Sequence, residues 1–214
     1  MDLIFKQFRI QCTHPFGIAR STHDYYDIIF VYLEHDGIIG RGEAAPSKRY
    51  GEYPINVLNQ LKKILDIPHF DSAVDGDTWF MSQSNGIKSL EAALSMAWLD
   101  WWTQKNNQPL YDYFQADSSQ QLDTSFTIAI GELNLIPDKI DEASPYSIIK
   151  VKLGVSESED KDIIRRIRKE TDKLIRVDAN EGWDLETGER MCHWLSDQNV
   201  EFIEQPFKAD NLEI

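Results

Sequence analysis

The sequence predicts an α+β domain followed by an α/β domain. Three stretches with strand character occupy the first 45 residues, and helical periodicity then runs from residue 54 to residue 114. After residue 120 the pattern changes to strands that alternate with helices. Strands followed by helices are typical of α+β domains, and strand–helix repetition is typical of a parallel sheet.

In the first domain, residues 1–12 alternate between apolar and polar, and YYDIIFVYL at 25–33 forms a second β-rich run. The tripeptide HDG then predicts a turn before the strand IIGRGEAAP. Between the first two strands, the polar segment HPFGIARSTHD is predicted to be a loop, and loops of this length tend to be either disordered or functional. The segment IKSLEAALSMAWLDWW repeats its apolar residues at helical spacing, and QPLYDYF closes the helical region.

In the second domain, four strands are predicted at TSFTIAI, YSIIKVKL, LIRVDAN and VEFIEQP. The segments SESEDKDIIRRIRKETDK and DLETGERMCHWLSDQ are predicted to be the helices between the last three strands. Such a repeat builds either a doubly wound sheet or a (β/α)8 barrel. From the change of pattern we place the domains at 1–118 and 119–214.

Composition excludes several classes of function. Acidic residues outnumber basic ones by 36 to 22, giving a net charge of −14, which disfavours nucleic acid and anionic membranes as partners. No apolar run reaches the roughly 20 residues needed to span a bilayer, and the N-terminus lacks the pattern of a signal peptide. The two cysteines show no CxxC spacing, so we expect a reduced, cytoplasmic protein.

Charged residues close each of the last three predicted strands. Lys150 and Lys152 end one strand, Asp178 ends the next and Glu204 the last, at a regular spacing of 26 residues. In a barrel, this C-terminal end of the strands is where active sites lie. Each feature also has a purely structural explanation: lysines protect edge strands, Asp178-Ala-Asn180 suits a capped turn, and Glu204-Gln-Pro can simply end a strand. Their equivalent positions in successive units favour a shared site.

The residue types at these strand ends suit proton transfer beside a metal ion. Because side chains alternate along a strand, Lys150 and Lys152 are predicted to lie on one face, with Val151 on the other. Crowding by a second cation and partial burial are expected to lower the pKa of a lysine amine. Asp178 and Glu204 supply hard oxygen ligands that suit Mg²⁺, with a third ligand expected from elsewhere.

The strand-end motifs KVK, RVDANEGW and FIEQP, in this order and spacing, resemble the enolase superfamily, in its muconate-lactonizing-enzyme subgroup. HPFGIAR, GRGEAAP, SLEAALSMAWLDWW and QPLYDYF in turn resemble the capping domain of that subgroup. The resemblance implies an α+β N-terminal capping domain followed by the first half of a (β/α)8, TIM-type barrel. It is strongest to dipeptide epimerases of the L-Ala-D/L-Glu type, which are isomerases.

The resemblance also implies roles in binding a dipeptide and moving its proton. Lys152 corresponds to the acid/base lysine, and Lys150 to a neighbour that tunes it and faces the substrate carboxylate. Arg20, in PFGIAR, corresponds to an arginine that contacts an acidic substrate side chain. Thr127, in TSFTIAI, corresponds to a substrate-contacting threonine.

The same resemblance implies a Mg²⁺ site with Asp178 and Glu204 as ligands and Asn180 as a group that supports them. Removing the proton α to a carboxylate creates a dianionic enediolate, whose charge a divalent cation neutralises while a lysine takes the proton. Enolase-superfamily sites use a lysine or histidine base beside one or two Mg²⁺ ions, and this is the residue set that the resemblance implies here.

Part of the family pattern has no counterpart in these 214 residues. The family places a third carboxylate, an opposing lysine and an acidic motif after the fourth strand. We therefore expect either a piece of a longer protein or a half-barrel that needs a partner, inactive in epimerisation alone and prone to self-association at its open edge. The alternatives are o-succinylbenzoate synthase or muconate cycloisomerase, and, from a different class, a non-catalytic binding or assembly module. Arg20 and Thr127 favour the epimerase.

Overall fold

The computed structural model describes residues 1–209, so the last five residues of the predicted second domain lie outside the described residues. It divides the chain into two compact units. Unit 1 comprises residues 1–11 and 25–120, and unit 2 comprises residues 12–24 and 121–214. No helix among residues 1–209 is both long and apolar enough to cross a membrane.

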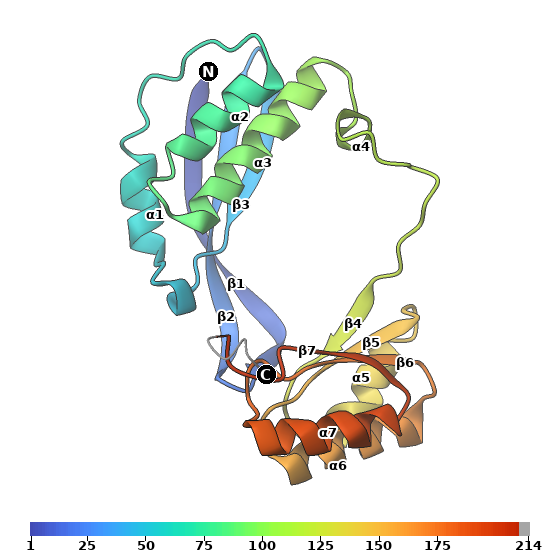
Figure 1. Ribbon diagram of the computed structural model, residues 1–214. Coiled ribbons are helices and arrows are strands. Elements are labelled where there is room, and N and C mark those ends of the chain that lie inside the picture. The colour runs from blue at the N-terminus through green and yellow to red at the C-terminus, as the bar shows by residue number, and fades with distance from the viewer. Residues whose placement is uncertain (210–214) are drawn as a thin grey trace. The chain divides into compact units, whose positions relative to one another are not determined.

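Unit 1 contains an antiparallel sheet with four helices, as the sequence predicts for an α+β domain. The strands β1 (Asp2–Ile18), β2 (Ser21–His35) and β3 (Ile38–Ala44) lie in that order, and a 3-10 turn, η1 (Lys48–Tyr50), follows them. The helices are α1 (Pro54–Leu61), α2 (Ala73–Ser82), α3 (Lys88–Lys105) and α4 (Leu110–Tyr113) (Figure 1). The predicted helical face of residues 87–101 is buried, with Leu90, Leu94 and Trp98 in the core.

The loop predicted for HPFGIARSTHD is wrong. β1 continues to Ile18 and β2 begins at Ser21, so a turn at Ala19 and Arg20 joins two long strands. The physical reason is a long-range pairing, because the Ile130 N–H donates to the carbonyl of Gly17 at 3.0 Å. We call residues 12–24 the hairpin tip. It belongs to unit 2, whereas the rest of both strands belongs to unit 1.

Unit 2 contains a parallel four-stranded sheet in the order β4-β5-β6-β7. The strands are β4 (Ser125–Ile128), β5 (Ile148–Lys152), β6 (Leu174–Asp178) and β7 (Val200–Glu204). They alternate with η2 (Leu133–Leu135), α5 (Ile136–Glu142), α6 (Glu157–Glu170) and α7 (Leu185–Ser196). The sequence predicts every one of these elements except η2 and α5.

Two helices of unit 2, α6 and α7, begin directly after residues whose side chains cap them. Ser156 accepts a hydrogen bond from the Glu159 N–H, and the Ser156 hydroxyl donates to the Glu159 carboxylate at 2.8 Å, a reciprocal pairing at the start of α6. Asp184 caps α7 by accepting from the Thr187 N–H at 2.8 Å. Local sequence therefore fixes the start of α6 and of α7, and with it the length of the turn that precedes each of them.

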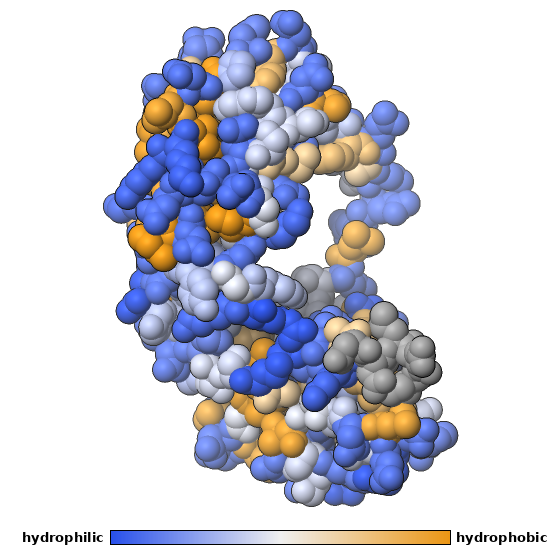
Figure 2. Space-filling view, turned by 60° about the vertical axis from the view of Figure 1, so that its left-hand side comes forward, coloured by the Kyte–Doolittle hydropathy of each residue, from blue (hydrophilic) through white to orange (hydrophobic). Residues whose placement is uncertain are grey.

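One face of the parallel sheet is covered by helices, and Figure 1 shows α6 and α7 side by side on that face. Val151 and Val177 are fully buried there against Ile164 and Ile167 of α6. Because side chains alternate along a strand, the residues beside these valines point to the opposite face. The surface drawn in Figure 2 is mostly hydrophilic.

Candidate active site

The register of the sheet brings the predicted strand-end residues together. Lys152 pairs with Asp178, and Asp178 pairs with Glu204, so the three side chains form one row across β5, β6 and β7. Lys150 lies two residues before Lys152 on β5 and pairs with Thr127 on β4. All five side chains lie on the face of the sheet away from the helices.

The carboxylate of Asp178 is the centre of this row. Its side chain is 3% exposed, and it accepts a hydrogen bond from Lys152 Nζ at 2.6 Å through Oδ2. Lys150 Nζ lies 3.5 Å from the same oxygen, and the backbone N–H of Asn180 donates to Oδ1 at 2.9 Å. Burial alone would raise the pKa of Asp178, but these hydrogen bonds and positive charges outweigh it and hold the pKa below its usual value.

Lys150 bridges the two carboxylates. It forms a short ion pair with Glu204, whose side chain is 43% exposed, in addition to its contact with Asp178. Burial alone would lower the pKa of the Lys150 amine, but the hydrogen bond to Glu204 and the charges of both carboxylates raise it. The lowered amine pKa expected from crowding by a second lysine is therefore wrong for Lys150, because this amine is paired with both Glu204 and Asp178.

Asn180 follows Asp178 in the turn after β6. It is buried and adopts a left-handed backbone conformation, with φ of 49°, which asparagine tolerates better than most residues. Its side-chain N–H donates to Gln205 at 3.4 Å. Within the described part of the chain, its buried Oδ1 has no hydrogen-bond partner. This oxygen is an unused acceptor on a residue that lies two positions after Asp178.

Arg20 and Thr127 both belong to unit 2. The Arg20 guanidinium donates to the Asn180 carbonyl at 2.5 Å and lies 3.4 Å from the Glu181 carboxylate. The hairpin tip is thereby bound to the turn after β6. Thr127, on β4, lines a cavity together with Phe16 of the tip and Lys139 of α5. The structure thus places Arg20 next to Asn180, and Thr127 in the strand beside Lys150.

The donor set fits a divalent cation in part. Asp178 and Glu204 present carboxylate oxygens on adjacent strands, with the unpaired oxygen of Asn180 close in sequence. Among residues 1–209, no group of three or more histidine, cysteine, aspartate or glutamate side chains is placed to hold a metal. The described residues thus do not test the expectation that a third metal ligand comes from another part of the protein, and it stays a prediction.

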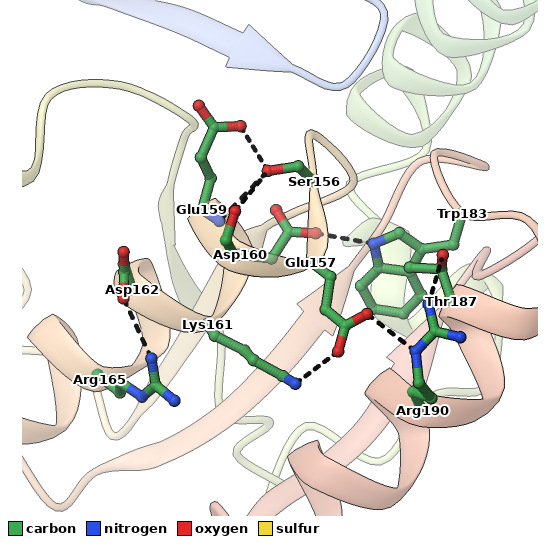
Figure 3. A network of polar contacts seen from close by, with 11 residues as sticks. Ser156, Glu157, Glu159, Asp160, Lys161, Asp162, Arg165, Trp183, Thr187 and Arg190 are labelled. Carbon is green, nitrogen blue, oxygen red and sulfur yellow. Dashed lines mark hydrogen bonds and ion pairs between the residues drawn. The ribbon is translucent and has the colours of Figure 1, made fainter.

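One buried acid beside the row escaped the prediction from sequence. Asp160, in the first turn of α6, is fully buried and accepts a hydrogen bond from the indole N–H of Trp183 at 2.7 Å (Figure 3). The sequence did contain a signal that Asp160 is buried. Asp160 precedes Ile163 and Ile164 by three and four residues and so falls on the apolar face of the helix. Acids are common in the first turn of any helix, and this masked the pattern.

Comparison with known proteins agrees with this architecture. Residues 138–214 match the family described as enolase C-terminal domain-like. An L-Ala-D/L-amino acid epimerase from Flavobacterium johnsoniae is 31% identical over all of this chain and 63% of its own length. An L-Ala-D/L-Glu epimerase from Bacteroides thetaiotaomicron is 30% identical over all of this chain and 56% of its own length.

A solved structure has a similar fold. A dipeptide epimerase from Methylococcus capsulatus, complexed with Mg and the dipeptide L-Arg-D-Lys, superposes with a TM-score of 0.87 at 25% identity, covering 99% of this chain and 62% of that one. The chain thus spans about three fifths of the length of the relatives that it matches.

Fold and site together define a protein with a capping domain and the first strands of a (β/α)8 barrel. The resemblance to the enolase superfamily is confirmed, and residues 138–214 match the enolase C-terminal domain-like family.

Proposed function

We propose that this chain carries the first part of the active site of a Mg²⁺-dependent dipeptide epimerase. The observation that carries the proposal is the row of Lys152, Asp178 and Glu204 across three adjacent strands, with Lys150 bridging the two carboxylates. The named activities of the relatives support the reaction class, and the bound Mg and dipeptide of the Methylococcus capsulatus structure support the cofactor and substrate class.

In the proposed reaction, Lys152 removes the proton α to the dipeptide carboxylate. Its amine now donates to Asp178 at 2.6 Å, so Lys152 must leave this carboxylate and lose a proton before it can act as a base. Lys150, which keeps a positive charge next to two acids, would face the substrate carboxylate and stabilise the negative charge of the enediolate. The two lysines thus have different tasks on one face of the strand.

Asp178 and Glu204 would hold the metal ion, and Asn180 would support them. Such an ion, when bound, supplies positive charge to the substrate carboxylate as its α-carbon becomes acidic. Arg20 and Thr127 would contact the dipeptide. Because Arg20 already binds the Asn180 carbonyl, its guanidinium would reach the substrate with that turn as its support.

A cytoplasmic location is part of this proposal. Cys12 and Cys192 are both free and half-buried, as expected for a reducing compartment. The proposed partner is a small-molecule dipeptide, and association with a second copy of the chain is a further expectation.

Proton exchange at the dipeptide α-carbon tests the function directly. A single base on one face of the substrate is sufficient for exchange with retention of configuration, even where epimerisation requires a second base. We expect the 214-residue chain with Mg²⁺ in D₂O to incorporate deuterium into acidic or hydrophobic L,L-dipeptides, followed by ¹H NMR. Lys152→Ala should abolish exchange, whereas Lys169→Ala, the same substitution on the exposed end of α6, should not change it.

A chain that exchanges no dipeptide proton and whose Mn²⁺ affinity is unaffected by Asp178→Asn would contradict the proposal. The non-catalytic binding or assembly module would then be the better explanation of the fold.

A further inference from the structure

Asp160 is a charged residue in a place where charge is costly. Its side chain is fully buried, on the face of α6 that also buries Ile163, Ile164 and Ile167. A buried carboxylate is tolerated when its oxygens are hydrogen-bonded, and a smaller apolar residue would fill this position at lower cost. The presence of an acid at this position therefore calls for an explanation in terms of its partners.

The partners of Asp160 come from two different turns. Its Oδ2 accepts from the Gly154 N–H at 2.9 Å and from the Trp183 indole N–H at 2.7 Å, and its Oδ1 accepts from the Val155 N–H at 3.3 Å. Gly154 and Val155 form the turn after β5, just beyond Lys152. Trp183 lies in the turn after β6, five residues beyond Asp178. Figure 3 shows the Asp160 carboxylate aimed at the indole.

The two turns are also in direct contact with each other. Gly154 adopts φ of +101°, and a Cβ atom at this position would lie 2.2 Å from the Ala179 carbonyl oxygen. A Cβ atom at Gly182 would lie 2.3 Å from the Gly154 carbonyl oxygen. Glycine is required at both positions, since any other residue would force the turns apart. We call this close contact between the turns after β5 and β6 the junction. The carboxylate of Asp160 forms hydrogen bonds to both of these turns.

This junction sets the relative position of the two strand ends. Between the junction and the paired side chains runs one further backbone hydrogen bond, from the Leu153 N–H to the Asp178 carbonyl at 2.9 Å. Asp178 is the acceptor of this bond and Lys152 directly precedes its donor, and the side chains of these two residues meet at 2.6 Å. A shift of either turn would therefore move the amine and the carboxylate relative to each other.

We propose that Asp160 is a positioning residue, which holds the turns after β5 and β6 together and so fixes Lys152 against Asp178. The inference rests on the proposed function only in so far as that pair does the chemistry. The carboxylate itself touches neither residue of the pair. It acts through the Gly154 and Val155 amides on one side and through the Trp183 indole on the other.

Three variants of the full 214-residue chain test the inference. Asp160→Asn keeps the shape of the side chain but cannot accept from all three donors, because one oxygen becomes an NH₂ group. Trp183→Phe removes one donor and keeps an aromatic ring. Asp162→Asn, on an exposed aspartate of α6 that pairs with Arg165, is the matched control.

Amide hydrogen exchange by NMR is the first readout. We expect Asp160→Asn to speed exchange at Gly154 and Val155 by about tenfold or more, because hydrogen bonds to a charged acceptor are lost. If Asp160 positions the strand ends, exchange also quickens at the Leu153 amide, which donates to Asp178, and at the Asn180 amide, which donates to the Asp178 carboxylate. Trp183→Phe should fall between Asp160→Asn and the parent chain, and Asp162→Asn should match the parent chain.

Mn²⁺ affinity, measured by titration calorimetry, is the second readout, and Asp160→Asn should weaken it by about tenfold. Faster exchange confined to Gly154 and Val155, with unchanged exchange at Leu153 and Asn180, would overturn the inference. If the parent chain binds no Mn²⁺, the proposed function fails, and exchange at Leu153 and Asn180 still decides the role of Asp160. Should Asp160→Asn fail to fold, the same amides in Trp183→Phe give the answer, and parent-like exchange there would refute the role.

Discussion

Replacing Lys152 by methionine should destabilise the metal-free chain. The substitution keeps the apolar stem and removes the ammonium group that donates to Asp178 at 2.6 Å. Both side chains are well shielded, at 12% and 3% exposure, so solvent screens the pair poorly. Removing one partner of a buried pair costs about 3–5 kcal/mol.

Two contacts reduce that cost here. Asp178 keeps the Asn180 N–H at 2.9 Å, and Lys150 remains 3.5 Å away. We therefore expect Lys152→Met to lower the free energy of unfolding by about 2–3 kcal/mol. The double variant Lys152→Met/Asp178→Asn leaves no unpaired acid, so the two single effects should not add, and their coupling should be about 1.5 kcal/mol or more.

Urea unfolding at pH 7 with EDTA, followed by circular dichroism, measures each term of this cycle. Lys88→Met is the matched control, because Lys88 also has a carboxylate partner, Glu91 at 2.8 Å, but its side chain is 76% exposed. Its cost should stay within about 0.5 kcal/mol. The reasoning is refuted if Lys152→Met costs no more than Lys88→Met, or if the cycle shows no coupling.

Three further predictions concern pH, a helix cap and the core. Folding lowers the pKa of Asp178, so the stability that its ionised carboxylate contributes is complete above the unfolded pKa of about 3.9. This contribution is lost as the pH falls through the folded pKa. In thermal melts over a series of pH values, Asp178→Asn should therefore remove this part of the acid transition. Ser156→Ala should cost about 1 kcal/mol by removing the cap of α6, whereas Ser158→Ala should cost little, both measured by urea midpoints. Leu94→Ala, fully buried in unit 1, should cost about 3 kcal/mol; a thermal melt within 2 °C of the parent would contradict the packing described.

The strand ends of unit 2 could be predicted because two simple periodicities determine them. Alternation along β5 places Lys150 and Lys152 on one face, and the equal spacing of the strands brings Asp178 and Glu204 into the same row. Both rules are local and hold whatever the rest of the chain does. The partners of those residues did not follow from the rules, which is why the raised pKa of Lys150 was missed.

Features made by distant parts of the chain could not be predicted. The hairpin tip looked like a polar loop, because the partner that keeps it extended, Ile130, lies more than 100 residues further along the chain. Asp160 looked like an ordinary first-turn acid, because the indole and amides that bind it come from turns whose contact requires the folded sheet. The sequence pattern predicts which face of a helix or strand is apolar. The partners of a polar residue on that face depend on the three-dimensional fold.

The assignment of the hairpin tip to unit 2 has a consequence for how the chain acquires its structure. Arg20 binds the Asn180 carbonyl across 160 residues of sequence, so this contact can form only after the turn that contains Asn180 has been made. Contacts of such high sequence separation slow folding and lengthen the time during which apolar surface stays open. A cut near residue 120 would not separate two self-sufficient pieces, because the C-terminal piece would lose residues 12–24. Dissection of this protein should therefore keep the hairpin tip, supplied as a peptide if necessary, together with the sheet that it supports.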